Sequence, residues 1–330
     1  MKKSLIVLCL LTYSLFAQAQ VKNYPLIEHY TNTKCPSCAG NNPTFYTKTL
    51  PFINSSVHHI SYHPSFPYPT CELYLANTSE NNARAAFNGA NYTPSYVLNG
   101  GSLQSVTTLT ITSLNAEILK TSPIELKVKE ISAGSNLTAN IKLKTYGDVG
   151  SSKYKLMVAL CEKTLAYNAP NGEKTHYDVF RKMLTSVNGN DIVAMPAVGN
   201  ETEFNFNYEL NSKWNAAQMY VLAWVVNADT KAVLNSGSKF TSLVSNDEVA
   251  LADGVQVYPN PANQVLNIDL SDDKYMGSKY ELIHPSGQVL REGKVEGTKF
   301  QISISDFEVP YFIVKINGPD GIFATKVAKQ

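Results

Sequence analysis

Residues 24–119 alternate short apolar runs with segments of helical spacing, a pattern typical of an α/β fold. The pattern predicts strands and helices, in the order strand, helix, strand, helix, strand, helix, at 24–27, 39–50, 56–62, 79–87, 96–98 and 106–119. Pro43 interrupts the first helix, because an interior proline removes a backbone hydrogen bond. We expect Ser79 to cap the second helix.

Beyond residue 121 the pattern changes to an alternation of apolar and polar positions. Period-two segments, separated by Gly, Asn and Asp turns, occur at 124–129, 137–146, 154–162, 203–210 and 220–227. Several short strands without helical segments between them predict an antiparallel β-sandwich over residues 122–242.

The last part of the chain, residues 254–330, is also predicted to be a small all-β sandwich. Prolines on both sides of Asn260 favour an extended entry, and an alternating run at 265–270 follows. Further β-type runs occur at 279–284, 289–295, 300–304 and 311–316. The expected order is therefore an α/β domain at 20–121, the sandwich at 122–242, a linker at 243–253 and the second sandwich.

The first nineteen residues have the three parts of a secretory signal peptide. Lys2 and Lys3 precede an apolar segment at 5–15, and small residues follow at Ala17 and Ala19, so cleavage is expected after Ala19. The mature protein is therefore predicted to lie outside the cytoplasm.

Composition narrows the range of partners. The chain has 330 residues, is 44% hydrophobic and carries a formal net charge of +1, so it can bury several cores and is close to neutral. A near-neutral chain is not expected to bind nucleic acid. The sequence contains no nucleotide-binding glycine loop and no Ser-His-Asp signature, and it predicts no cofactor.

The C-x-x-C pair formed by Cys35 and Cys38 has the clearest chemistry. Two thiols with this spacing at the start of a helix can close a small disulfide ring, and the helix N-terminus stabilises the first thiolate. The spacing therefore predicts a redox pair. A structural disulfide is the alternative, and zinc is a third interpretation, although no second C-x-x-C or H-x-x-x-H motif accompanies the pair.

Two further cysteines, Cys71 and Cys161, belong to the expected mature chain. In an oxidising compartment a Cys71–Cys161 bridge beside a Cys35–Cys38 bridge is the most economical pairing. The alternative is that Cys161, which lies in an apolar run, is a buried free thiol.

Three nearby histidines, His58, His59 and His63, raise the question of a metal. On a strand, His59 and His63 share one face while His58 points to the other. Structural roles are the preferred interpretation, and copper held by the cysteine pair with His59 or His63 is the weaker option.

The order strand, C-x-x-C, helix, strand, helix, Thr-Pro, strand and helix resembles the thioredoxin-like fold. The resemblance implies that Cys35 is the nucleophile, that Cys38 is the resolving thiol and that a cis Pro94 lies against the dithiol and helps bind an extended substrate. Two positions depart from the family pattern. Lys34, after Thr33, stands where an aromatic is usual and could favour a thiolate by its charge, and Glu28 is the only acid in the first strand.

A second resemblance rests on residues 168–184 together with 79–84 and the Thr-Pro motif. These segments resemble the Omp28-related outer membrane protein family, in which a thioredoxin-like unit is joined to a β-sandwich, with surface adhesion or receptor roles implied. His176 and Arg181 are candidates for an interdomain or ligand contact. The simpler interpretation places both on an exposed strand or loop.

The motif at 257–262 and the strands after it resemble the type A C-terminal sorting domain of the type IX secretion system. This resemblance implies contact with the type IX machinery, export to the cell surface or the medium, and cleavage within 245–253.

Together these features predict a secreted or cell-surface protein that exchanges disulfides with an unidentified protein substrate through Cys35, Cys38 and Pro94. The alternative is a non-catalytic surface binding or adhesion protein that holds a surface ligand and uses the dithiol as a permanent staple.

Overall fold

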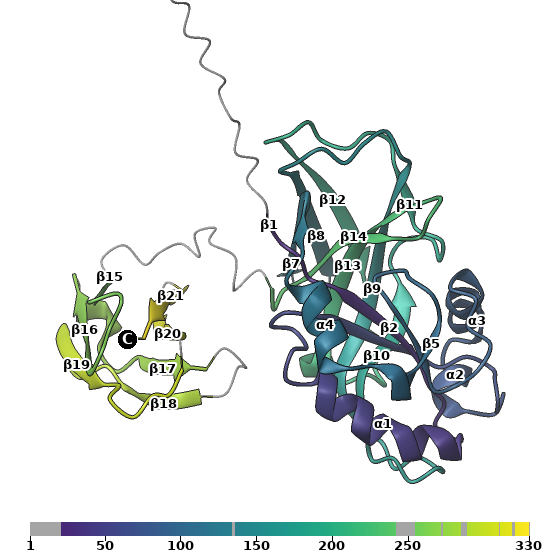
Figure 1. Cartoon of the computed structure of the whole chain (residues 1–330), viewed down its shortest axis with the longest axis horizontal. Helices are drawn as coiled ribbons and strands as arrows, with labels where there is room; N and C mark the ends of the chain where they lie inside the picture. Colours follow the sequence, from purple (N-terminus) through teal and green to yellow (C-terminus); the bar gives the residue numbers. More distant parts are fainter. Residues whose placement is uncertain are drawn as a thin grey trace, which may run out of the picture.

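The computed structural model describes residues 21–133, 136–241, 255–271, 273–284, 289–309, 311–318 and 321–329. The expected signal peptide, its cleavage site and the linker 243–253 lie outside these residues. Over the described ranges the chain is mostly β and forms several sheets (Figure 1). None of the helices in these ranges has the length and apolar character needed to cross a membrane.

The N-terminal part keeps the predicted order of strands and helices, but it adds short elements that were not predicted, and its last helix begins at Ile111 rather than at residue 106. It contains β1 (Val21–Lys22), β2 (Leu26–Tyr30), α1 (Pro36–Thr49), β3 (His58–Tyr62), α2 (Glu72–Leu75), α3 (Thr78–Phe87), β4 (Ser95–Leu98), β5 (Gln104–Ser105), α4 (Ile111–Ile118) and β6 (Thr121–Ser122). The expected cap at Ser79 is wrong, since the Asn77 side chain accepts the backbone N–H of Glu80 and caps α3 instead.

The middle part is all β. Its strands are β7 (Ile124–Ala133), β8 (Asn136–Thr145), β9 (Tyr154–Ala166), β10 (Thr175–Met183), β11 (Asn190–Ile192), β12 (Glu201–Tyr208), β13 (Met219–Asn227) and β14 (Val233–Ser238). Strands β12, β8 and β7 form a three-stranded antiparallel sheet. The others pair with β9, directly or through a neighbour.

A parallel pairing between β10 and β3, with Val179 opposite Ser61, joins the N-terminal and middle parts in one sheet. The sheet has nine strands in the order β14-β13-β9-β10-β3-β2-β4-β5, with β11 added beside β9. The sheet therefore continues across residue 121.

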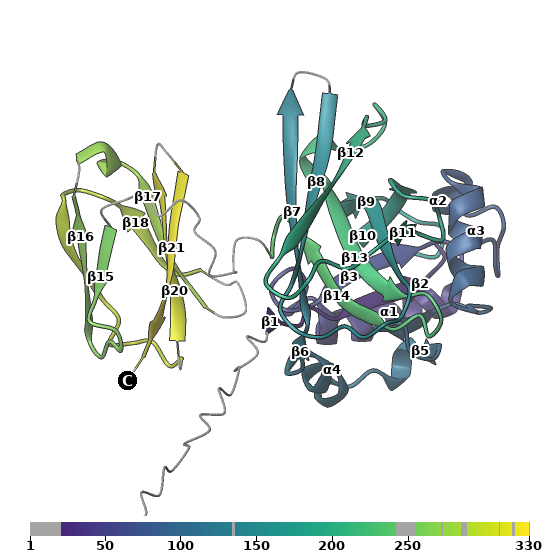
Figure 2. The same cartoon turned by 90° about the horizontal axis from the view of Figure 1, so that it is seen from above.

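The hydrophobic core also extends across the N-terminal and middle parts. One face of the large sheet buries a single hydrophobic cluster that contains Tyr30 and Tyr62 from β2 and β3, Trp224 from β13 and Ala85 from α3. The opposite face is covered in two places. The three-stranded sheet packs over β9 and β13, and α1 packs over β2 and β4 (Figures 1 and 2).

The C-terminal part forms its own core between two sheets. Its strands are β15 (Val255–Tyr258), β16 (Val265–Leu270), β17 (Lys279–Ile283), β18 (Val289–Lys294), β19 (Lys299–Ser303), β20 (Tyr311–Gly318) and β21 (Gly321–Ala328). Their orders are β15-β16-β19 and β18-β17-β20-β21, and Leu266, Phe312 and Val314 lie in the core between them. The final strand, β21, was not among the predicted runs.

Candidate functional site

Cys35 lies at the N-terminus of α1, as the C-x-x-C spacing predicts. It is the cap residue with extended backbone, and Pro36 occupies the first helical turn, where no N–H is needed. The backbone N–H of Cys38 donates to the Cys35 Sγ at 3.3 Å, and the Ser37 Oγ lies 3.0 Å from the same sulfur. The sulfur thus receives donors that would stabilise a thiolate.

The pKa values of the two thiols are shifted in opposite directions. Burial opposes ionisation of Cys35, but hydrogen bonds from Cys38, Ser37 and Thr93 outweigh it and lower the pKa of Cys35. Burial raises the pKa of Cys38 to about 12, and its hydrogen bond to Cys35 acts in the same direction. Cys35 is therefore the thiol that ionises first, and Cys38 stays protonated beside it.

Pro94 is brought to the dithiol through the residue before it. The Thr93–Pro94 peptide bond is cis, and the Cys35 thiol donates to the Thr93 carbonyl oxygen with an Sγ···O distance of 3.8 Å. The sequence-predicted residues Cys35, Cys38 and Pro94 therefore lie at one place, although about 60 positions separate the thiols from the proline.

Cys35 lies just beneath the surface. Cys35 is 2% exposed and Cys38 is fully buried, while Tyr92, next to the Thr-Pro motif, is 43% exposed. Pro36 and Ser37 are also exposed. A partner disulfide would have to approach Cys35 between these residues.

Lys34 and Glu28, the two residues that depart from the family pattern, bind other side chains than Cys35. Lys34 donates from Nζ to the Thr70 hydroxyl at 2.9 Å. Glu28 lies on the opposite face of β2, where its carboxylate binds Arg84 at 2.6 Å. Neither side chain is among the interactions that lower the pKa of Cys35.

Two residues of the site, Asn171 and Glu173, were not predicted. Both lie in the connection between β9 and β10, residues 167–174. The Asn171 side chain donates to the carbonyl oxygen of Cys35 at 3.1 Å, and Glu173 accepts from Asn42 of α1 at 2.8 Å. The only local signal was the Asn-Gly turn at 171–172, which predicts a bend and says nothing of its partner.

The other two cysteines are buried free thiols. Cys71 lies 3.0 Å from the Thr33 Oγ1, and Cys161 lies in the large core cluster on β9. Burial raises the pKa of Cys161 well above its usual value. The structure has neither a Cys35–Cys38 nor a Cys71–Cys161 bridge, so the pairing expected as most economical is absent and the free-thiol alternative describes Cys161.

Two of the three histidines of the 56–63 segment, His58 and His59, have buried polar partners, whereas the buried His63 Nε2 has none among the described residues. His58 lies between the Ser236 and Ser238 hydroxyls, at 2.7 and 3.0 Å. His59 contacts Asp178 at 2.9 Å and His29 at 3.3 Å. Within the described ranges, no group of three or more His, Cys, Asp or Glu side chains is arranged to hold a metal ion.

His176 and Arg181 lie on β10, and both are buried, so the interpretation as exposed residues is wrong. His176 contacts the Tyr167 carbonyl oxygen at 3.1 Å, and Arg181 donates from Nε to Glu162 at 2.9 Å. Burial lowers the pKa of His63, and the nearby charges of His176 and Arg181 lower it further. These β10 residues therefore face the end of β3 at the junction of the large sheet.

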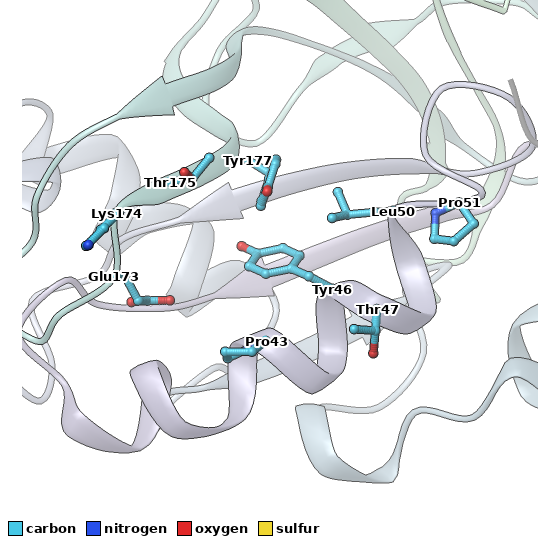
Figure 3. Close-up of a pocket in the computed structure, with 9 residues that line it drawn as sticks. All are labelled: Pro43, Tyr46, Thr47, Leu50, Pro51, Glu173, Lys174, Thr175 and Tyr177. Atoms are coloured by element: carbon cyan, nitrogen blue, oxygen red, sulfur yellow. The ribbon is translucent and has the colours of Figure 1, made fainter. Parts of the chain in front are cut away.

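An open pocket of about 530 Å³ lies beside the site, between α1 and the start of β10 (Figure 3). The rings of Tyr46 and Tyr177 both line it and pack against each other edge to face, with centroids 4.8 Å apart. The pocket runs along α1, with Glu173 at one end and Leu50, which follows the last turn of α1, at the other. The pocket and the dithiol therefore share α1 and Glu173.

Comparison with known proteins gives a family for two parts of the chain. The family described as outer membrane protein Omp28 matches residues 81–242, and the secretion system C-terminal sorting domain matches residues 256–330. No curated protein matches the chain.

One solved structure shows a shared fold over most of the chain. HBP35 of Porphyromonas gingivalis is 17% identical, with a TM-score of 0.55 over 93% of this chain and 98% of its own. A domain of the outer membrane lipoprotein Omp28 from the same organism is 15% identical, with a TM-score of 0.28, over 36% of this chain and 86% of its own.

A sorting domain of this kind directs proteins to the cell surface or the medium and implies contact with the type IX secretion machinery. The protein is therefore secreted or located at the cell surface. On these matches, the chain combines a domain of the Omp28 outer membrane protein family, at residues 81–242, with a secretion-system C-terminal sorting domain.

Proposed function

We propose that this protein is a secreted or surface-displayed thiol–disulfide exchange protein whose N-terminal part is thioredoxin-like. The observation that carries the proposal is the hydrogen-bonded Cys35 sulfur at the start of α1, beside Thr93 and Pro94. The parallel pair β2–β3 and the antiparallel strand β4 after the Thr-Pro motif support the same assignment.

The reaction follows from the two acidities. The Cys35 thiolate attacks one sulfur of a partner disulfide, which forms a mixed disulfide and releases the other partner sulfur as a thiolate. Cys38 then gives up its proton to a released thiolate and attacks the Cys35 sulfur. The products are a Cys35–Cys38 disulfide and a partner dithiol, so the partner gains the two electrons that the protein loses.

Pro94 and its neighbours would hold the partner. The Thr93 carbonyl oxygen and the exposed Tyr92 lie beside the thiol, and β4 begins directly after Pro94. An extended peptide carrying the disulfide is the substrate class that this arrangement favours.

Single cysteine variants of the signal-free chain test the proposal. We expect Cys35→Ser to abolish exchange with a peptide disulfide, and Cys38→Ser to retain attack but accumulate a mixed disulfide that is visible by mass spectrometry. Cys161→Ala is the matched control, because that thiol lies in the large core cluster on β9, and its exchange rate should stay near wild type. The absence of both turnover in the wild type and trapping in Cys38→Ser would overturn the proposal.

One observation favours a second candidate function, a non-catalytic surface binding protein. Both sulfurs of the pair are almost completely buried, as expected for a staple. In that case Cys35→Ser would lower the stability of the chain and leave binding of a surface ligand intact. The trapping experiment separates the two functions, because a staple forms no mixed disulfide.

A further inference from the structure

The connection between β9 and β10 reaches back onto the turn that carries the dithiol. The backbone N–H of Asn171 donates to the Thr33 carbonyl oxygen at 3.1 Å. The Asn171 side-chain amide donates to the Cys35 carbonyl oxygen at 3.1 Å and lies 3.4 Å from that of Asn32. A segment that follows the dithiol by more than 130 residues thus holds the backbone on both sides of Lys34.

Glu173 ties this connection to the helix. One carboxylate oxygen accepts from the Asn171 amide at 2.7 Å, and the other accepts from the Asn42 amide at 2.8 Å. Asn42 is buried in α1 and also donates to the Thr31 hydroxyl at 2.9 Å. Since both oxygens receive an N–H, the position requires a group with two acceptors, and only a carboxylate has one at each end.

We propose that Asn171 and Glu173 are positioning residues of the dithiol site, which is completed by the middle part of the chain. They act through the backbone of the Cys35 turn and through Asn42, and they touch neither sulfur. The inference rests on the proposed exchange function of the same dithiol, but it concerns how the Cys35 thiolate is held.

The turn controls the thiolate because it sets the direction of a donor. Cys35 caps α1 with extended backbone, and this conformation points the Cys38 N–H at the Cys35 sulfur, 3.3 Å away. The Cys35 carbonyl also accepts the backbone N–H groups of Cys38 and Ala39, at 3.2 and 3.3 Å. If it loses its contact with Asn171, only these helix bonds hold the cap, and we expect the N–H···S contact to lengthen. The thiolate then loses stabilisation from the helix N-terminus.

The Glu173→Gln substitution is expected to shift the pKa of Cys35 in opposite directions, depending on whether Glu173 acts by positioning the turn or by its charge. Glutamine presents an NH₂ group to one of the two amides, so one tie is broken and the pKa of Cys35 should rise. Removal of a nearby negative charge alone would favour the thiolate and lower that pKa. The direction of the shift therefore distinguishes the two effects.

The experiment measures alkylation of Cys35 by iodoacetamide against pH in the reduced, signal-free chain, with the Cys35 peptide followed by mass spectrometry. We expect Glu173→Gln and Asn171→Ala each to slow alkylation below the midpoint by about threefold to tenfold and to move the midpoint upward. Lys174→Gln is the matched control, since the exposed Lys174 adjoins Glu173 in the same connection. Its alkylation rate at each pH should stay within a factor of two of the wild-type rate.

Unchanged or downward midpoints in Glu173→Gln and Asn171→Ala would overturn the inference. Far-ultraviolet circular dichroism confirms that each variant is folded, and Glu173→Asp, which keeps the carboxylate, serves if the glutamine variant is not. The outcome is independent of the proposed function. A wild type that exchanges no disulfide but shows the expected midpoint shifts would refute exchange and leave the positioning role in place.

Discussion

At the scale of single residues, His58 shows how burial makes the fold sensitive to acid. Its ring is fully buried between two serine hydroxyls, and burial, followed by the charge of Lys22, lowers its pKa from 6.5 to about 3. Between these values the unfolded chain binds a proton that the folded chain rejects. Stability is therefore lost as the pH falls from 6.5 toward 3, by about 1.4 kcal/mol per pH unit from this residue.

Urea unfolding at pH 7 and pH 5 measures this contribution. We expect His58→Gln to unfold with a smaller loss of free energy between the two pH values than the wild type, because glutamine does not titrate. Burial also lowers the pKa of His29, His63 and His176, so the variant should keep a residual pH dependence from these three histidines. Identical slopes in wild type and variant would contradict the assignment.

The ion pair between Glu28 and Arg84 is a second residue-scale test. Both side chains are buried, and Asn88 donates to the second Glu28 oxygen at 2.8 Å. We expect Glu28→Gln to lower the free energy of unfolding by about 3 kcal/mol, because it leaves a buried guanidinium without its counter-charge. The solvent-screened pairs of Lys142 with Glu201 and Glu203 are the control, and Lys142→Met should leave the free energy of unfolding close to that of the wild type.

Local spacing was enough to find the thiols. The cysteine pair, the helix start and the Thr-Pro motif can each be recognised from a few consecutive residues. Asn171 and Glu173 were missed because their contacts depend on where β10 pairs in the large sheet. An Asn-Gly-Glu turn carries no sign of a partner more than 130 residues away.

At the scale of elements, two glycines differ in the space around them, and substituting each with alanine tests how closely the neighbouring elements pack. A Cβ on Gly237 of β14 would collide with the backbone of Leu126 on β7, whereas one on Gly40 of α1 would meet nothing within 4 Å. We expect Gly237→Ala to destabilise the chain by about 1–3 kcal/mol through overpacking, and Gly40→Ala to stabilise it by about 0.5–1 kcal/mol through helix propensity. Thermal unfolding checks both, and equal effects would refute the close approach of β14 to β7.

Period-two alternation predicted the strands with one apolar face, such as β7, β8 and β12. It missed β10 and β14, whose polar residues are buried rather than exposed. Asp178 on β10 binds His59 and Tyr220, and Asn235 on β14 donates to the Ile124 carbonyl oxygen at 2.7 Å. A polar residue indicates an exposed position only if no buried hydrogen-bond partner is available to it. The spacing of residues in the sequence does not reveal such partners.

At the scale of the whole molecule, the sorting domain has its own core. Among the described strands, those after residue 254 pair only with one another, and their buried residues form a separate cluster. We therefore expect a chain ending at residue 242 to unfold at the same temperature as the corresponding transition of the longer chain, within about 2 °C. A loss of several degrees in differential scanning calorimetry would show that the sorting domain stabilises the rest.

The junction of β10 with β3 constrains how the chain can be made. During synthesis β3 stays an open edge until residues 175–183 emerge, more than 110 positions later, and each of its five residues is buried in the finished protein. Bare edges of this kind invite pairing with other chains. A fragment cut at residue 121 should consequently precipitate, so the shortest manageable recombinant piece ends beyond β14.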